Sequence, residues 1–243
     1  MRTTRIYQNQ LLATGSRLVL DAETSHYLGT VLRLRPGAAL LVFNSRDGEF
    51  AAHIASAEKQ SLSIELSAQQ RPPSAASLSI HLGLGISRGD RMDFAIQKST
   101  ELGVSHITPV YSQYGEVKLK EDRVENKLRH WSRIATSAAE QSGRLDIPAV
   151  STPQSLEEWQ SSLGESVRLL LDPSGPEKIG QNIGSREQGF ALLIGPEGGF
   201  AERELEWAVK RGFKIVSLGP RILRTETAPA AALAILQHRF GDM

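Results

Sequence analysis

The chain has 243 residues, 40% of them hydrophobic and 23% charged, with a formal net charge of +1. This balance is typical of a folded protein with one large domain or two small ones, and it argues against disorder. The absence of cysteine excludes disulfides, thiolate metal sites and a catalytic thiol. The sequence has no apolar run near the roughly 20 residues of a membrane span and no signal-peptide pattern, so we expect a cytoplasmic protein.

The first 70 residues have the pattern of a small β domain. Short apolar runs are separated by turn signals such as Pro36-Gly37, and residues 62–66 alternate between apolar and polar, as in a half-buried strand. These runs predict strands at residues 17–20, 39–43, 49–57 and 61–66. Together with one helical turn near residues 22–28 they favour a small barrel or sandwich, and the prolines at positions 72 and 73 indicate a linker.

After residue 77 the pattern changes to strands that alternate with helices. Apolar runs predict strands at residues 78–86, 106–111, 167–171, 190–194 and 214–218. Amphipathic stretches predict helices at residues 90–102, 122–142, 202–210 and 228–239. The uninterrupted apolar strands are typical of a parallel sheet that is covered on both faces. The alternation therefore predicts an α/β domain with a mainly parallel sheet.

Two common signatures are imperfect or absent. Residues 81–89 superficially resemble a dinucleotide-binding fingerprint, but Arg88 stands where the third glycine is required. We therefore interpret Gly83 and Gly85 as residues that allow close packing at the end of a strand. The histidines fall singly, without the spacing of zinc ligands, so we expect no metal site.

Three loops of the second half follow predicted strands, at the end where open α/β sheets bind their ligands. They cover residues 170–175, 194–200 and 218–228. Glycines in the second loop supply a backbone that can approach a ligand closely. No loop carries the Gly-Lys-Ser/Thr of a phosphate site, so the loops favour a nucleoside over a triphosphate as the ligand. Each loop could instead be a plain turn, with Thr225 or Thr227 acting only as a helix N-cap.

At residues 195–200 and 218–228 the sequence resembles the bacterial RsmE family of ribosomal RNA methyltransferases, in the SPOUT superfamily. Further similar stretches are residues 89–103, 139–144 and 238–242, so the resemblance spans the chain. It implies a PUA-like β-barrel RNA-binding domain at residues 1–72 and an α/β domain with a SPOUT-type trefoil knot and a parallel sheet at residues 74–243.

The resemblance also implies the reaction. It implies a homodimer that uses S-adenosyl-L-methionine to methylate N3 of a uridine in 16S ribosomal RNA, within the small ribosomal subunit. The cofactor is expected in the three loops, bound by Leu171, Asp172, Pro173, Ile194, Gly195, Pro196, Glu197, Gly198, Gly199, Leu218, Gly219, Ile222, Leu223, Arg224, Thr225, Thr227 and Ala228.

Charged residues in these loops are the candidates for catalysis. N3 of uridine carries a proton and is a poor nucleophile until that proton leaves. We expect Arg224 to stabilise the developing anion and Glu197 or Glu226 to orient or deprotonate the base. The alternative for Arg224 is a structural ion pair in the fold or the dimer.

Basic residues outside the loops are the candidates for RNA contact. Residues 1–35 contain five arginines and two acidic residues, a balance that permits a polyanionic partner without requiring one. The residues expected to contact RNA are Arg2, Arg5, Arg33, Arg88, Arg91 and Lys98. For each of them a solvated surface position is the alternative.

Two alternative functions remain open on the sequence. A SPOUT methyltransferase with a different RNA target, such as a 2′-hydroxyl group, would be distinguished by analysis of the methylated nucleoside. A non-catalytic RNA-binding ribosome-assembly factor would be distinguished by its failure to bind the cofactor. A nicotinamide-dependent oxidoreductase is a more distant alternative.

Overall fold

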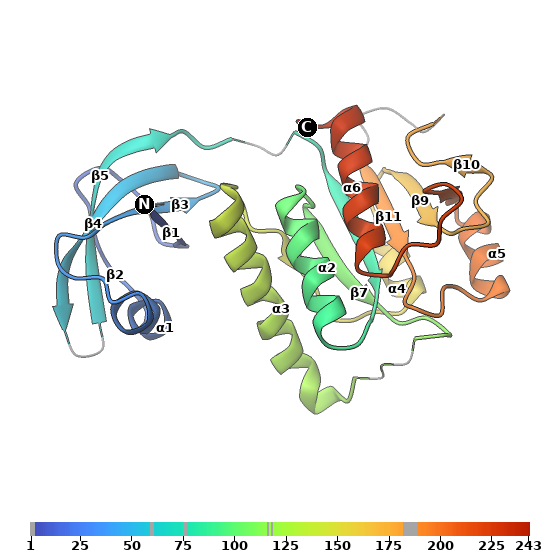
Figure 1. The fold of residues 1–243 in the computed structure, drawn as a ribbon, viewed down its shortest axis with the longest axis horizontal. Coiled ribbons are helices and arrows are strands. Elements are labelled where there is room, and N and C mark those ends of the chain that lie inside the picture. Colours follow the sequence, from blue (N-terminus) through green and yellow to red (C-terminus); the bar gives the residue numbers. More distant parts are fainter. Residues whose placement is uncertain (1–2, 59–60, 75–76, 116, 118, 182–188) are drawn as a thin grey trace. The chain divides into compact units, whose positions relative to one another are not determined.

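The structure is a computed structural model in which residues 3–58, 61–74, 77–115, 117, 119–181 and 189–243 are described (Figure 1). The chain divides into two compact units. The first unit comprises Met1–Ala75 and Ala139–Asp146, and the second comprises Ala76–Ala138 and Ile147–Met243. The sequence placed residues 139–146 in the second domain, whereas in the structure they pack with the first unit.

The first unit is built on one five-stranded sheet. Its strands, in spatial order, are β1 (Thr4–Tyr7), β3 (Ala39–Asn44), β4 (Gly48–Glu58), β5 (Ser61–Arg71) and β2 (Arg17–Val19). Strands β1 and β3 are parallel and the other neighbours are antiparallel. The strands predicted from the apolar runs are confirmed, and β1 is an addition. Alternate residues of these strands, such as Val42, Ile54 and Ile64, form the buried core.

A short helical segment covers this sheet. Helix α1 (Ala22–His26) begins after Asp21, whose carboxylate accepts a hydrogen bond from the Thr24 amide at 2.8 Å. The chain continues directly into a π-helical turn, η1 (Tyr27–Val31). Leu28 of this turn is fully buried and belongs to the core of the unit. The predicted helical turn is confirmed, in a longer and more unusual form.

The second unit is built on a seven-stranded sheet in which all neighbouring strands are parallel. The strands, in spatial order, are β10 (Glu177–Lys178), β12 (Lys214–Ser217), β9 (Val167–Leu171), β11 (Phe190–Ile194), β6 (Ile80–Gly85), β7 (His106–Val110) and β8 (Ala149–Val150). The α/β class with a mainly parallel sheet is confirmed. The two-residue strands β8 and β10 are too short to give a pattern in the sequence.

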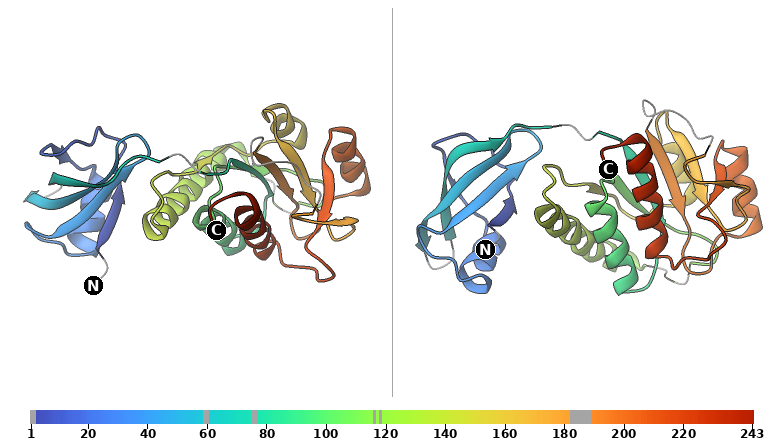
Figure 2. Two further views of the ribbon diagram at one scale, coloured as in Figure 1. Left: turned by 90° about the horizontal axis from the view of Figure 1, so that it is seen from above. Right: turned by 45° about the horizontal axis from the view of Figure 1, so that its top comes forward.

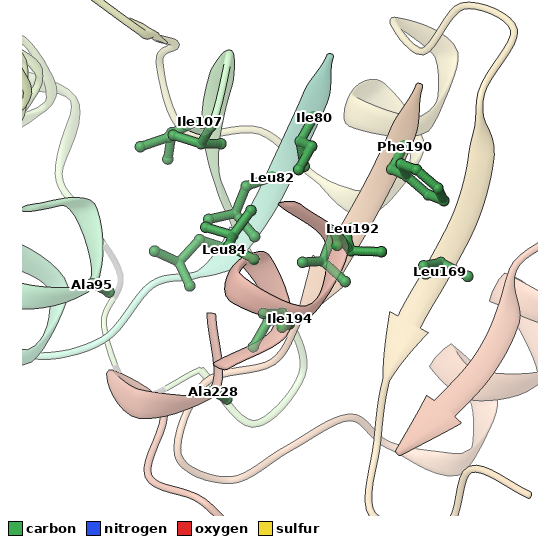
Figure 3. Close-up of a cluster of buried hydrophobic side chains, with 14 of the residues drawn as sticks. Ile80, Leu82, Leu84, Ala95, Ile107, Leu169, Phe190, Leu192, Ile194 and Ala228 are labelled. Carbon is green, nitrogen blue, oxygen red and sulfur yellow. The ribbon is translucent and has the colours of Figure 1, made fainter. Parts of the chain in front are cut away.

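Helices cover both faces of this sheet (Figure 2). Helices α2 (Asp90–Glu101), α3 (Glu121–Ser142) and α6 (Thr227–Phe240) contribute to one buried cluster, and α4 (Leu156–Ser161) and α5 (Glu202–Lys210) contribute to the other. The central strand β11 therefore buries every side chain. Phe190, Leu192 and Ile194 of β11 lie in the first cluster, which Figure 3 shows, while Ala191 and Leu193 lie in the second.

Helix α6 is packed between the sheet and the segment that follows β10. Ile179 shares a buried cluster with Leu233 and Leu236 of α6. A Cβ atom added to Gly180 would lie 3.1 Å from the side chain of Ile235. A trefoil knot depends on how the connections between these strands thread, and residues 182–188, between β10 and β11, lie outside the described residues. The knot therefore stays a prediction.

Candidate cofactor and active site

Three loops meet at one edge of the second sheet. Strands β12, β9 and β11 are neighbours and parallel, so the loops at their carboxyl ends converge. Together they line a cavity of about 460 Å³. The lining residues are Leu171, Asp172, Pro173, Ser174, Ile194, Gly195, Pro196, Glu197, Gly198, Gly199, Phe200, Leu218, Gly219, Arg221, Ile222, Leu223, Thr225 and Ala228.

This lining contains all but two of the residues that the sequence analysis expected to hold a cofactor. Arg224 and Thr227 do not line the cavity, and Ser174, Phe200 and Arg221 line it without having been predicted. Arg221 lies within a loop that was predicted as a whole, so its position was available in the sequence. Ser174 and Phe200 directly adjoin predicted residues, and no pattern in the sequence singles them out.

The loops have defined local geometry. Asp172 starts a tight turn because its Oδ1 accepts hydrogen bonds from the Ser174 amide at 2.9 Å and the Ser174 hydroxyl at 2.6 Å. Gly219 has a φ of 106°, a conformation that favours glycine. The carbonyl of Arg224 accepts from the amides of Thr227 and Ala228, both at 2.9 Å, and so begins α6. The N-cap is Glu226, not Thr225 or Thr227.

The turn between β6 and α2 supports the loop that follows β11. A Cβ atom on Gly85 would lie 2.4 Å from the backbone nitrogen of Pro196, so only glycine allows this approach. The interpretation of Gly83 and Gly85 as close-packing residues is confirmed, because a Cβ atom on Gly83 would lie 2.7 Å from the ring of Trp159. This turn supports the cavity although it contributes none of its lining residues.

Residues 85–89 of the same turn also match the pattern G-x-S-x-G of a hydrolase nucleophile. Ser87 is buried, however, and its hydroxyl donates to the carbonyl of Gly85 at 3.4 Å. Its other partner is the carboxylate of Glu197. A serine nucleophile needs an adjacent general base that can take its proton, which an ion-paired carboxylate does poorly. We therefore interpret Ser87 as a support for the cavity.

Glu197 is held by an ion pair. Arg91, in the first turn of α2, places Nη1 2.8 Å from Glu197 Oε1. Burial raises the pKa of Glu197, but the hydrogen bonds from Arg91, from its own backbone and from Ser87 outweigh burial and lower the pKa below its ordinary value. A carboxylate with a lowered pKa is a weaker base. The geometry therefore speaks against Glu197 as the group that deprotonates uridine and favours a role in fixing the loop.

Arg224 and Glu226 occupy the outer part of the third loop. The Arg224 guanidinium lies 4.0 Å from the Glu226 carboxylate, and its side chain is 83% exposed. Ile222 in the same loop is equally exposed, which is unusual for a large apolar side chain. The loop therefore exposes two arginines, Arg221 and Arg224, and one apolar side chain. Of these, Arg221 and Ile222 also line the cavity, and Arg224 does not.

Arg5 has a structural environment that contradicts its predicted role in RNA contact. Its guanidinium binds the carboxylate of Glu49 and donates to the carbonyls of Ala139, Glu140 and Arg144 at 2.8–3.0 Å. The side chain is almost completely buried. All its donors toward residues 139–144 are directed at main-chain carbonyls near the end of α3, so it cannot bind phosphate without breaking this network.

The remaining predicted RNA contacts differ from one another. Arg2 lies outside the described residues. Lys98 pairs with Glu101 at 2.8 Å, and Arg91 pairs with Glu197 as described above. Arg33 and Arg88 are exposed. Of the five that the structure describes, none lines the cofactor cavity, and only some have a surface position suited to a phosphate.

Two negative findings apply to the part of the chain that the structure describes. Within it, no group of three histidine, cysteine, aspartate or glutamate side chains could hold a metal ion. None of the helices found there is long and apolar enough to cross a membrane.

Comparisons with known proteins identify the family. Residues 74–237 match the RNA methyltransferase domain, and residues 20–67 match the RNA methyltransferase PUA domain. Ribosomal RNA small subunit methyltransferase E of Buchnera aphidicola is 36% identical, over 100% of this chain and 98% of its own. The Bacillus subtilis protein of the same name is 29% identical, over 90% and 89%. The chain belongs to the ribosomal RNA small subunit methyltransferase E family. The resemblance seen in the sequence is confirmed.

Solved structures of this family share the whole fold. Ribosomal RNA small subunit methyltransferase E from Neisseria gonorrhoeae, solved bound to S-adenosyl methionine, is 35% identical with a TM-score of 0.91. A Legionella pneumophila protein described as a methyltransferase, solved with its cofactor SAM bound, is 37% identical with a TM-score of 0.94. Each comparison covers 100% of both chains.

Proposed function

We propose that this chain is an S-adenosyl-L-methionine-dependent methyltransferase that acts on small-subunit ribosomal RNA, with N3 of a uridine as the methyl acceptor. The observation that carries the proposal is the single cavity formed by the loops after β9, β11 and β12, in a chain of this family. An enzyme that modifies ribosomal RNA works where ribosomes are assembled, so the cytoplasmic location expected from the sequence follows from this proposal.

The cavity suits the proposed cofactor. Its volume of about 460 Å³ lies in the usual range for small-molecule sites. Apolar side chains such as Leu171, Ile194 and Leu223 provide walls for an adenine ring, and the exposed glycine backbone supplies donors and acceptors for its edge. The carboxylate of Asp172 complements a cationic ligand. S-adenosyl-L-methionine would supply an activated methyl group there.

The residues of the chain must then prepare the uridine. N3 carries a proton, and its removal leaves negative charge on the ring that a nearby cation would stabilise. We assign this cation to Arg224, because its guanidinium is exposed beside the cavity and its only close carboxylate among the described residues, Glu226, is 4.0 Å away. Glu226 is the remaining candidate to orient Arg224 or to accept the proton, since Glu197 is engaged by Arg91.

RNA contact is assigned to exposed cations only. Arg33 of the first unit and Arg88 beside α2 remain candidates, because both are exposed. Phosphate contacts of this kind make affinity fall steeply with salt. Arg5 is withdrawn from this set because its guanidinium is buried in an internal network.

A homodimer is part of the proposal. Helices α2 and α6 pack against each other and cover the same face of the second sheet. Phe94 of α2 and Ile235 of α6 are exposed, which supports a second copy as the partner of this face. Sedimentation of the wild type and of the Phe94→Glu/Ile235→Glu variant tests this. If the two proteins have the same mass in solution, these helices do not form the dimer interface.

The function is tested with small ribosomal subunits that lack the modification. Labelled S-adenosyl-L-methionine is added, and the nucleosides are then analysed by mass spectrometry. We expect 3-methyluridine. A different methylated nucleoside would keep the cofactor and change the target, whereas no incorporation together with no cofactor binding would overturn the enzymatic assignment.

The role of Arg224 has its own test. Arg224→Ala should lower turnover by about 100-fold or more, as for other groups that stabilise developing charge, while cofactor affinity is retained. Arg203→Ala, which removes an exposed arginine from α5, is the matched control. Unchanged turnover in Arg224→Ala would sink the catalytic assignment.

A further inference from the structure

The charged side chains around the cofactor cavity are few and unequally engaged. Among the described residues that line the cavity, Arg221 is the only one with a cationic side chain, and Asp172 and Glu197 are the acidic ones. Glu197 is balanced by Arg91 at 2.8 Å, and Arg91 does not line the cavity. Arg221 is exposed and forms no ion pair with another residue of the described chain. Its charge is therefore available to a ligand.

The backbone on both sides of Arg221 is anchored. Leu218 and Leu223, which precede and follow it in the third loop, pack against the first buried cluster of the second sheet. Between them, Gly219 has a φ of 106°, and the ring of Pro220 restricts φ at the next position. The loop therefore holds the backbone of Arg221 at the cavity, while its exposed side chain is able to reach a ligand.

The proposed cofactor has one group that needs such a cation. S-adenosyl-L-methionine is a nucleoside without phosphate, and its amino-acid tail ends in an ammonium group and a carboxylate. That carboxylate is the only anionic group of the molecule. Arginine binds a carboxylate through two parallel N–H donors, which adds direction to the attraction between the charges. The single cation of the lining therefore matches the single anion of the ligand.

We propose that Arg221 binds the carboxylate of this amino-acid tail and makes the cavity select the complete methyl donor over its decarboxylated form. The inference rests on the proposed function, and it adds a residue that determines the specificity of the cavity. The decarboxylated form has the same nucleoside and the same sulfonium centre as the complete donor. Apolar walls and backbone hydrogen bonds that hold the nucleoside cannot distinguish the two, because discrimination requires a group that treats them differently.

The acidic lining makes this discrimination necessary. Loss of the carboxylate gives the decarboxylated form one more net positive charge. The carboxylate of Asp172, fixed in its turn by two hydrogen bonds from Ser174, attracts the more cationic ligand. Without Arg221, the charges of the cavity would therefore favour the decarboxylated form. With Arg221 present, that form meets a cation that it cannot pair, and such a repulsive element is a common source of specificity.

The selection is tested by binding, with ligands that cannot transfer a methyl group. The full chain is titrated by calorimetry with S-adenosylhomocysteine, with decarboxylated S-adenosylhomocysteine and with 5′-methylthioadenosine, which has no amino-acid tail. The wild type should bind S-adenosylhomocysteine about tenfold more tightly than the decarboxylated ligand, at the lower end of the effects typical of hydrogen bonds to charged groups. In Arg221→Ala this preference should disappear or reverse, while the affinity for 5′-methylthioadenosine stays at the wild-type value.

Two further variants serve as controls. Arg224→Ala removes an exposed arginine from the same loop, but Arg224 does not line the cavity, so this variant should keep the wild-type preference. Arg221→Lys keeps the charge and loses the two parallel donors, so its preference should lie between those of the wild type and Arg221→Ala. A general change of charge in the loop would instead affect Arg221→Ala and Arg224→Ala alike.

Three results would overturn the inference. The first is an unchanged preference in Arg221→Ala, including the case in which this variant loses affinity for RNA alone and Arg221 is an RNA contact. The second is an equal loss of affinity for all three ligands, which would make the role of Arg221 structural. The third is a wild type that binds S-adenosylhomocysteine and its decarboxylated form equally. The proposed function would survive each of them, whereas a wild type that binds none of the ligands and methylates no RNA would overturn the proposed function itself.

Discussion

Each unit of the protein contains an arginine–glutamate pair between distant parts of the chain, and the two pairs differ in burial. In the first unit, Arg5 and Glu49 are 9% and 7% exposed, and Arg71 pairs with the same carboxylate. In the second, Arg91 and Glu197 are 52% and 33% exposed. The chemistry of the two pairs is the same, so the difference in their roles comes from the surroundings.

Burial decides what each pair can do. Burial raises the pKa of Glu49, but the hydrogen bonds from Arg71 and Arg5 outweigh it, so the net pKa is below its ordinary value. Two charges out of water are tolerated only while every partner is present, which makes this network a structural element. The Arg91–Glu197 pair remains in contact with water, where an ion pair contributes little to stability. The role of this pair is to hold in place the loop that contains Glu197.

The largest expected effect is that of Arg5→Met. The substitution leaves Glu49 with a single partner and deprives three main-chain carbonyls near the end of α3 of their donor. Removal of one partner from a buried pair typically costs about 3–5 kcal/mol. We expect a loss of this order in the free energy of unfolding, measured by urea denaturation of the full chain. Arg46→Ala, at an exposed ion pair, should leave the free energy of unfolding close to that of the wild type. A variant of wild-type stability with weakened RNA binding would restore Arg5 as an RNA contact.

The second largest effect is expected for Gly85→Ala, which tests whether the β6–α2 turn supports the cofactor site. Gly85→Ala would force a methyl group against the backbone of Pro196 and shift the loop that contains Glu197. We expect the affinity for S-adenosyl-L-methionine, measured by calorimetry, to fall at least about tenfold, which corresponds to about 1.4 kcal/mol. Gly164→Ala is the control, because a Cβ atom there meets open space. Equal affinities for Gly85→Ala and the wild type would separate the turn from the cofactor site.

Acid should affect the two pairs unequally. The pKa of Glu49 in the folded chain is lowered, so its contribution to stability is present above the ordinary carboxyl pKa and is lost as the pH falls through the folded value. The wild type should therefore lose more stability between pH 7 and pH 3 than Glu49→Gln does, as measured by denaturation at both pH values. Glu197→Gln should match the acid response of the wild type more closely, because that carboxylate is partly solvated. A larger departure from the wild-type acid response in Glu197→Gln than in Glu49→Gln would contradict the conclusion that burial separates the two pairs.

The smallest effect is the coupling between Arg91 and Glu197. In a double-mutant cycle of Arg91→Ala and Glu197→Gln, we expect a coupling in stability of about 0.2–1 kcal/mol, as for other exposed pairs. In the same cycle, each single variant should raise the KM for S-adenosyl-L-methionine, and the double variant should raise it by less than the product of the two single effects. The affinity for RNA should not change. If Arg91→Ala weakened RNA binding and left cofactor binding intact, the original assignment of Arg91 to RNA would be correct.

Much of the second unit could be predicted because its patterns are local. Strands β9 and β11 are uninterrupted apolar runs, and α5 begins and ends where its amphipathic pattern does. The loops between such strands and helices were located by chain order, which is why most of the cavity lining was correct. Arg224 was placed in the cavity because the sequence gives the order of loop residues but not the direction of each side chain.

The first unit was harder to predict at the level of single residues. Strand β1 is four residues long and is paired with β3 through contacts distant in sequence, so no local pattern revealed it. The π-helical turn at Tyr27–Val31 and the positive φ of Arg33 likewise have no local pattern that the sequence analysis recognised. The excess of arginine near the N-terminus was a correct observation. It could not distinguish the buried Arg5 from the exposed Arg33, so both were predicted to contact RNA.

The sequence by itself determined the fold class, the family and the three loops, because hydrophobic periodicity, turn residues and short motifs act over a few neighbouring positions. Only the tertiary structure decided which charged groups are structural and which are free to bind. Arg5 and Arg33 are the same residue type in the same unit, and Glu197 and Glu226 lie in equivalent loops. What separates them is burial and the identity of the partner brought close by folding, and both depend on contacts between residues as far apart as Arg91 and Glu197.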